Sequence, residues 1–167
     1  MAPSPTKYNF TGKVALVTGS SAGIGEAIAL QLAQYGAKVV ITGRNAEKLN
    51  QVAQKIKAIS NGVEPLQVVG QLEDTSLPQK LIDETVAKFG RLDFLVNSAG
   101  QATPVGTLAI DNLLEEFDRV MAINVRSVVA LTKLAVPHLE KTKGSVINIS
   151  SGASIKPVRI CWFNYNL

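Results

Sequence analysis

Short apolar runs alternate along the chain with stretches in which apolar residues recur at helical spacing. The runs cover residues 14–17, 38–41, 66–69, 92–96 and 145–149. The first of them carries no charge, which is typical of a strand buried on both faces of a parallel sheet. Strands that alternate with helices join through right-handed crossovers. The pattern therefore predicts an α/β fold, a doubly wound parallel sheet in the order 3-2-1-4-5. Ligands are expected at the carboxyl ends of the strands, where the first and fourth strands meet.

The stretches between the runs carry the stripes and end signals of amphipathic helices. The expected inward stripes are Ile24, Ile28 and Leu32; then Leu49, Val52, Ala53 and Ile56; then Leu81, Ile82, Val86 and Phe89. Asn45 is a good N-cap for the second helix, and Ser76 with Gln79 predicts a capping box for the third. Gly90 is expected to end the third helix, and Asp111 to cap a long fourth helix.

The composition fits one soluble domain. A chain of 167 residues is long enough for one domain with a sizeable core. Its net charge of +4 comes from scattered basic residues without a basic run, so nucleic acid binding has no support. One cysteine excludes an internal disulfide framework, and no apolar run approaches the roughly 20 residues of a membrane span. Residues 1–9 are interpreted as a flexible tail rather than a signal peptide, so we expect a cytoplasmic protein.

The glycine-rich stretch after the first strand is the most informative part of the sequence. Gly19, Gly23 and Gly25 stand between that strand and the helical pattern that begins with Ile24. Such a turn aims free backbone N–H groups and the positive end of a helix dipole at one point, where a phosphate is held without a basic side chain. Glycine lets the turn close and the diphosphate approach the backbone. The alternative is a tight strand–helix turn that binds no ligand.

Residues 18–25 read T-G-S-S-A-G-I-G and resemble the cofactor loop of the short-chain dehydrogenase/reductase family. The resemblance implies a Rossmann-like fold with a dinucleotide cofactor. The loop residues that it assigns to cofactor binding are Thr18, Gly19, Ser20, Ser21, Gly23, Ile24 and Gly25.

A second motif follows the fourth strand. Asn97-Ser98-Ala99-Gly100 looks like the N-N-A-G motif of the same family, which implies cofactor contacts from Asn97, Ala99 and Gly100. In the family pattern Asn97 would also brace the sheet, and Gly100 would keep the floor of the nicotinamide site open.

The end of the second strand bears on which dinucleotide binds. NAD-preferring folds place an acid there, about twenty residues past the glycines, to accept hydrogen bonds from the ribose hydroxyls. Residues 42–45 hold no carboxylate, and Arg44 can pair with a 2′-phosphate in a bidentate way. This favours NADP(H) over NAD(H), although a solvated arginine beside a helix N-terminus is the alternative. After the third strand, the resemblance implies that Gln71, with Leu72, contacts the adenine where the family usually has aspartate.

The resemblance also implies three catalytic residues. Ser151 matches the serine that orients the substrate carbonyl, and Asn124 matches the asparagine of the proton relay. From the residues alone, Asn124 is better interpreted as a core asparagine with satisfied hydrogen bonds, because it interrupts an apolar stripe. Tyr165 lies near the position of the catalytic tyrosine, but the lysine of the family's Y-x-x-x-K motif would lie past Leu167. An adjacent ammonium lowers the pKa of a phenol enough for acid–base transfer, so poor activity is expected of this chain.

The resemblance covers about residues 10–157, which we interpret as a partial dinucleotide-binding domain. Residues 158–167 depart from the family pattern and hold the only tryptophan and the only cysteine. We therefore expect a divergent tail and a fold whose C-terminal part is missing.

Two functions from different classes remain open at this point. The first is an NADP(H)-dependent oxidoreductase that passes a hydride between the cofactor and a small-molecule carbonyl or alcohol substrate, with no metal. The second is a non-catalytic truncated module that binds a dinucleotide or a partner; a product that folds badly is the third alternative. Apolar residues on more than one face of the long helix expected over 111–135 favour association with a full-length family member.

Overall fold

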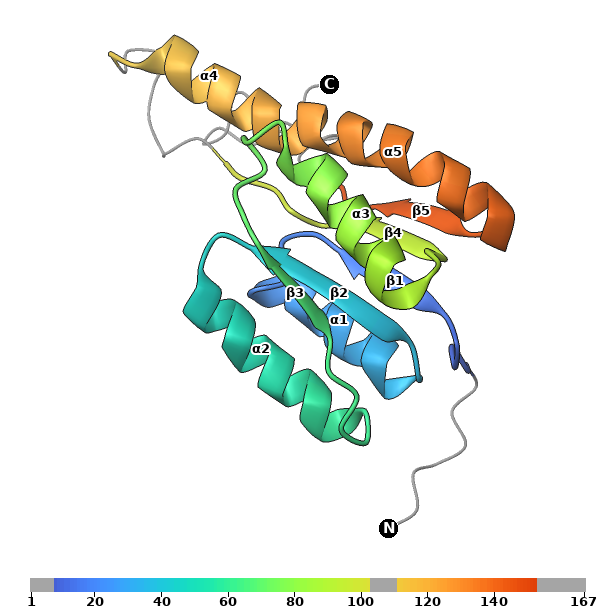
Figure 1. The fold of residues 1–167 in the computed structure, drawn as a ribbon. Coiled ribbons are helices and arrows are strands. Elements are labelled where there is room, and N and C mark those ends of the chain that lie inside the picture. Colours follow the sequence, from blue (N-terminus) through green and yellow to red (C-terminus); the bar gives the residue numbers. More distant parts are fainter. Residues whose placement is uncertain (1–7, 103–110, 153–167) are drawn as a thin grey trace.

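The computed structural model describes residues 8–102 and 111–152, which form a sheet with helices on both faces (Figure 1). The strands are β1 (Val14–Val17), β2 (Lys38–Gly43), β3 (Leu66–Val69), β4 (Phe94–Asn97) and β5 (Ser145–Asn148). The helices are α1 (Gly23–Gln34), α2 (Ala46–Ile59), α3 (Leu77–Phe89), α4 (Leu113–Met121), the π-helical turn η1 (Ala122–Arg126) and α5 (Ser127–Thr142). The expected divergent tail, residues 158–167, and Tyr165 within it lie outside the described residues.

The sheet confirms the predicted topology. Its order is β3-β2-β1-β4-β5, and each pair of neighbouring strands is parallel. β1 pairs with β2 on one side and with β4 on the other, so the reversal of strand order falls between β1 and β4. In this arrangement the loops that follow the strands converge at one edge of the sheet.

Two apolar clusters hold the layers together, one on each face of the sheet. Residues of β1 alternate between them, with Leu16 in the cluster under α3 and α5 and Val17 in the cluster under α1 and α2. Figure 1 shows α1 and α2 on one side and α3 with α5 on the other. All four residues of β1 are buried, which confirms the interpretation of its apolar run.

The second and third helical stripes are confirmed, but the first was partly wrong. Ile24 is 64% exposed, whereas the residues of α1 that are buried are Gly25, Ala29 and Ala33. The reason is a close approach of helix and loop, because a Cβ at Gly25 would lie 2.5 Å from the carbonyl oxygen of Gly19. Small residues therefore face the sheet, and Ile24 is turned toward the loops.

The helix ends correct two predictions. Asn45 caps α2 by accepting a hydrogen bond from the Lys48 N–H at 2.9 Å, and Gly90 ends α3 with φ 73°, as expected. The capping box of Ser76 and Gln79 was wrong, because the Ser76 hydroxyl donates to Asp74 at 2.8 Å and Gln79 donates to Asp83. Asp111 does not cap the fourth helix, whose N-cap position is Asn112.

The long helix expected after residue 111 is present but interrupted. The π-helical turn η1 separates α4 from α5 and places Asn124 in its centre. A π turn inserts an extra residue into the helical ladder and is frequent at functional sites. The hydrophobic stripe carries no signal for it, because the apolar positions continue on both sides.

Within the described ranges, the helical segment Leu113–Thr142 as a whole is long and apolar enough to cross a membrane. The mean hydropathy of its most apolar window is 1.4. The core helix of a soluble protein passes the same test, and α5 packs against α3 and β4. The packing supports the interpretation as a core helix, whose outward face carries Val125, Val129 and Val136 with exposed fractions of 36%, 63% and 40%.

Candidate functional site

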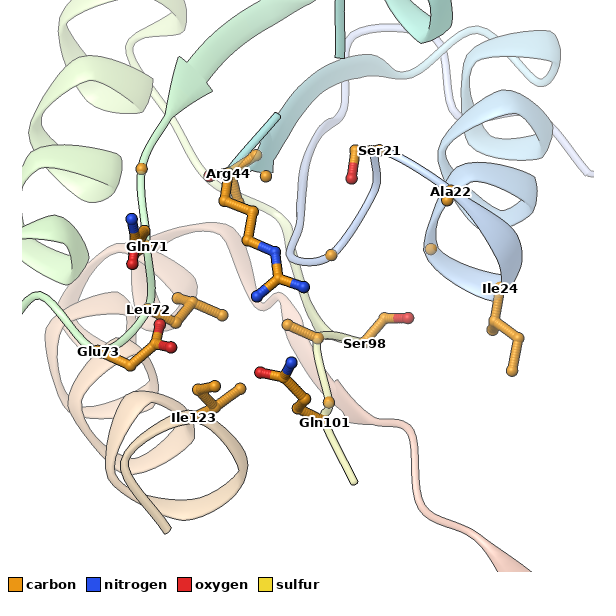
Figure 2. Close-up of a pocket in the computed structure, with 17 residues that line it drawn as sticks. Ser21, Ala22, Ile24, Arg44, Gln71, Leu72, Glu73, Ser98, Gln101 and Ile123 are labelled. Atoms are coloured by element: carbon orange, nitrogen blue, oxygen red, sulfur yellow. The ribbon is translucent and has the colours of Figure 1, made fainter. Parts of the chain in front are cut away.

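A cavity of about 430 Å³ opens at the carboxyl ends of the strands, where the sequence predicted a ligand site (Figure 2). Its walls come from the segments that follow β1, β2, β3 and β4, and from η1. The sequence-predicted residues that line it are Gly19, Ser21, Ile24, Gly25, Arg44, Gln71, Leu72, Ala99 and Gly100. The structure thus brings residues from four separate loops to one place.

The N-terminus of α1 faces this cavity with backbone N–H groups. Ala22, at the N-cap, has extended backbone and gives α1 no side-chain cap within the described residues. Gly23 has φ +58°, and a Cβ there would meet nothing within 4 Å. The uncapped N–H groups of the first turn, together with the helix dipole, form a site for an anion.

Glycine is required where the first loop crosses the loop after β4. A Cβ at Gly19 would lie 2.7 Å from the Cα of Ala99, and Gly19 has φ +64°. Any side chain there would push the two loops apart and change the floor of the cavity. The same crowding occurs at Gly43, whose Cβ would lie 2.8 Å from the Ser21 hydroxyl.

Two of the predicted cofactor residues act behind the cavity instead of lining it. The Thr18 hydroxyl accepts hydrogen bonds from the backbone N–H groups of Ser98 and Ala99, both at 3.0 Å. The Ser20 hydroxyl donates to the Val17 carbonyl and accepts from the Thr42 N–H, both at 2.9 Å. These buried side chains tie the first loop to β2 and to the loop after β4. Gly23 is also absent from the lining.

Arg44 is the only cation in the cavity lining, and Glu73 is the only acid, among the described residues. Figure 2 shows the Arg44 guanidinium extending into the cavity, between the N-terminus of α1 and the segment Gln71–Glu73. No carboxylate stands at the end of β2. The cavity therefore offers a planar donor group beside the anion site at α1.

The loop after β4 is braced by asparagine side chains. Asn97 is buried, does not line the cavity, and donates from its amide to the Asn148 side chain at 2.8 Å, so it joins β4 to β5. The three buried side-chain oxygens of Thr42, Asn97 and Ser98 have no hydrogen-bond partner within the described part of the chain. All three lie at the cavity end of the sheet, where a bound polar molecule or water would satisfy those open to it.

Asn124 is satisfied by the loop after β4. Its amide oxygen accepts from the Gln101 N–H and its amide nitrogen donates to the Gln101 carbonyl, both at 2.9 Å. These two hydrogen bonds agree with the alternative that Asn124 is an asparagine with satisfied hydrogen bonds. They also hold η1 against a loop that lines the cavity. The role of Asn124 in a proton relay stays a prediction.

Ser151 is half-buried after β5 and, like Asn124, is not part of the cavity lining. Tyr165, the third residue that the resemblance implies as catalytic, lies outside the described ranges. No group of three metal-binding side chains occurs in residues 8–102 and 111–152.

Sequence reasoning missed eight residues that line the cavity: Ala22, Thr42, Gly43, Gly70, Glu73, Ser98, Gln101 and Ile123. Most of them are direct neighbours of predicted residues at the strand ends, so the predicted topology could have suggested them. Ile123 comes from η1, and only its position beside Asn124 pointed to it.

Comparison with known proteins agrees with this architecture. The family model described as short chain dehydrogenase matches residues 13–166. The chain is 36% identical over 152 residues to 11-beta-hydroxysteroid dehydrogenase-like 2 of Arabidopsis thaliana, covering 90% of this chain and 48% of that relative. It therefore spans about half the length of this curated relative.

Two solved structures show the same fold. Glucose dehydrogenase of Caenorhabditis elegans, in its apo form, is 46% identical with a TM-score of 0.75, covering 86% of this chain and 56% of that chain. L-sorbose reductase of Gluconobacter frateurii, complexed with NADPH and L-sorbose, is 28% identical with a TM-score of 0.87, covering 95% of this chain and 59% of that one. With the family match over most of its length, this chain belongs to the short-chain dehydrogenase/reductase family, whose members are oxidoreductases.

Proposed function

We propose that the chain binds NADP(H) and is part of an oxidoreductase that transfers a hydride between this cofactor and a small-molecule carbonyl or alcohol. The observation that carries the proposal is Arg44, which extends into the cavity at the end of β2, where no carboxylate stands. A guanidinium there can pair with a 2′-phosphate, and a carboxylate would repel it. The L-sorbose reductase and a metagenomic oxidoreductase that this chain resembles are described in complex with NADPH and NADP.

The residues present fit a dinucleotide. The diphosphate would lie at the uncapped N-terminus of α1, where a Cβ at Gly25 would displace the loop. Ala99 and Gly100 would border the nicotinamide. A Cβ at Gly100 would meet nothing closer, among the described residues, than the Asn124 amide oxygen at 3.8 Å, so this side of the cavity is open. When bound, the cofactor supplies or accepts the hydride.

The catalytic part of the proposal is carried over from the family resemblance. Ser151 would donate a hydrogen bond to the substrate oxygen, Asn124 would hold the proton relay, and Tyr165 would exchange the proton. None of the tyrosines is followed by lysine at the Y-x-x-x-K spacing within these 167 residues. We therefore propose that this chain, tested by itself, turns over poorly. We also propose a cytoplasmic setting, as expected in the sequence analysis.

The second candidate function is association with a full-length family member. Val125, Val129 and Val136 recur at helical spacing on one face of η1 and α5 and are all exposed. A stripe of this kind suits a partner helix, and Val125 and Val129 lie in the helix over residues 111–135 through which the sequence predicted association. Sedimentation of the chain with and without such a relative would test it; independent sedimentation would contradict it.

Titration of both cofactors tests the NADP(H) assignment. We expect NADPH to bind more tightly than NADH, and Arg44→Ala to reduce NADPH affinity about ten- to a hundredfold, the cost of one charge-assisted pair. NADH binding should change little. Lys133→Ala, which removes an exposed charge on α5, is the matched control. Equal affinities for the two cofactors, or an unchanged preference in Arg44→Ala, would overturn the assignment.

A further inference from the structure

The cavity places a single carboxylate where the base of a bound dinucleotide would lie. Glu73 follows β3 and Leu72, and it is the only acid among the described residues that line the cavity. In Figure 2 it lies with Leu72 and Ile123 on one side of Arg44, whereas Ser21, Ala22 and Ile24 lie on the other. An acid in a site for a polyanion opposes binding unless it contacts a part of the ligand that donates hydrogen bonds.

The proposed orientation of the cofactor identifies that part, and this inference rests on the proposed function. With the diphosphate at α1 and the 2′-phosphate at Arg44, the base on the same ribose must extend past Arg44, away from α1. The cavity wall there consists of Leu72 and Ile123, of which Ile123 is only 6% exposed. Apolar side chains suit the faces of a flat heterocycle, and Glu73 would lie at its polar edge.

Glu73 is available for such a contact. Within residues 8–102 and 111–152 it makes no hydrogen bond or ion pair. The nearby cation Arg119 is already engaged, since its guanidinium donates to Glu116 at 2.6 and 3.3 Å. The hydrogen bond to Glu116 is the main cause of the raised pKa of Arg119, to which the charge of Glu73 adds at longer range. Arg119 therefore leaves the carboxylate oxygens of Glu73 open to a ligand.

We propose that the Glu73 carboxylate accepts a hydrogen bond from the exocyclic amine of the adenine, and so makes the site selective for an amino-purine. The sequence assigned this contact to Gln71, but an amide can rotate to present either a donor or an acceptor. It therefore accommodates a 6-amino or a 6-oxo purine alike. A carboxylate only accepts, so it opposes the carbonyl of a 6-oxo purine.

The test compares NADPH with its hypoxanthine analogue, in which a carbonyl replaces the amine, by fluorescence titration of the full chain. We expect NADPH to bind about ten- to a hundredfold more tightly than the analogue. The analogue loses the hydrogen bond to the charged Glu73, and its carbonyl oxygen faces the carboxylate instead. In Glu73→Gln the ratio of the two affinities should fall to about one, since the new amide can serve both bases. Glu140→Gln, an exposed acid on α5, should keep the original ratio.

The ratio separates base recognition from a structural role, because a general loosening of the loop would weaken both nucleotides equally. Glu73→Asp keeps the charge but shortens the side chain, so it should retain part of the preference for NADPH over the analogue. This variant serves as the test if Glu73→Gln does not fold. A ratio of the two affinities near one in the unmodified chain overturns the inference. An unchanged ratio in Glu73→Gln overturns it too, and so does a fall of the ratio to about one in Gln71→Ala. If neither nucleotide binds, the proposed function itself fails together with this inference.

Discussion

Asp93 should be a main source of the pH dependence of stability. Its side chain is only 2% exposed, yet it accepts hydrogen bonds from Arg91 at 2.6 and 2.8 Å, from the Val14 N–H at 3.0 Å and from Lys13 at 3.1 Å. Burial raises the pKa of this carboxyl, but the bonds from Arg91, Val14 and Lys13 outweigh it and hold the pKa below its ordinary value. The charged form therefore stabilises the junction of β1 and β4.

The perturbation is Asp93→Asn, which keeps the shape and removes the charge. The amide oxygen can still accept from one donor, but the amide N–H groups then face donors on the Arg91 and Lys13 side chains. Those two side chains are each 41% exposed, so their ion pairs contribute only about 0–1 kcal/mol each. The buried Val14 N–H adds about 1–3 kcal/mol if it is left without a partner. We expect a loss of about 1–5 kcal/mol near neutral pH.

The sign of the pH effect follows from the lowered pKa. A depressed folded-state pKa gives stability that is fully present above the unfolded value of about 3.9 and is lost as the pH falls through the folded value. Urea unfolding curves should therefore differ between the two proteins near pH 7 and converge at strongly acidic pH. Asp83→Asn, an exposed carboxylate bonded to Gln79, is the control and should change little. A constant difference at all pH values, or none near pH 7, would refute this account.

Three further outcomes are expected. Gly19→Ala should destabilise the chain by about 1–3 kcal/mol more than Gly12→Ala in thermal unfolding, because both have positive φ but only Gly19 would clash, with the Cα of Ala99; equal losses would contradict this. Thr18→Val should lower the free energy of unfolding by about 1–3 kcal/mol and speed hydrogen exchange at the Ala99 amide, since the valine leaves two N–H groups without their acceptor. Unchanged exchange would show that the Thr18 hydroxyl does not hold this loop in place. Val129→Lys should leave stability within about 0.5 kcal/mol but weaken any association seen by sedimentation, and persistent association would exclude that surface.

The order of the strands could be predicted because each apolar run is short, uncharged or nearly so, and separated from the next by a helical stripe. What the stripes could not show is how closely the layers approach. At α1 the contact between Gly25 and the Gly19 carbonyl leaves room only for small residues, so Ala29 and Ala33 face the sheet and Ile24 is exposed. A stripe drawn from the largest apolar residues therefore included Ile24 wrongly and left out the alanines, although Ile28 and Leu32 do pack, half-buried, against the cluster.

Local competition explains why the predicted capping box of the third helix was wrong. Ser76 has the side chain of an N-cap, but Asp74 accepts hydrogen bonds from its hydroxyl and from its backbone N–H at 2.8 and 2.9 Å. The third helix therefore begins without a side-chain cap from Ser76, with a proline in its first turn. The π turn around Asn124 could not be predicted from the sequence either, because one inserted residue leaves the composition of the stripe unchanged.

About half of the cavity lining was predicted from the sequence, whereas Asn97 was the only side chain expected to brace the site. The reason lies in how the two kinds of residue are encoded. Lining residues sit at the ends of strands, so topology alone collects Arg44, Leu72 and Ala99 at one edge. The braces depend on distances between loops that the sequence does not specify, as in the paired bonds of Asn124 to the backbone of Gln101. The two hydrogen bonds show that the Asn124 side chain positions the loop after β4. A change at Asn124 would therefore act on cofactor binding through that loop, whether or not Asn124 also takes part in a proton relay.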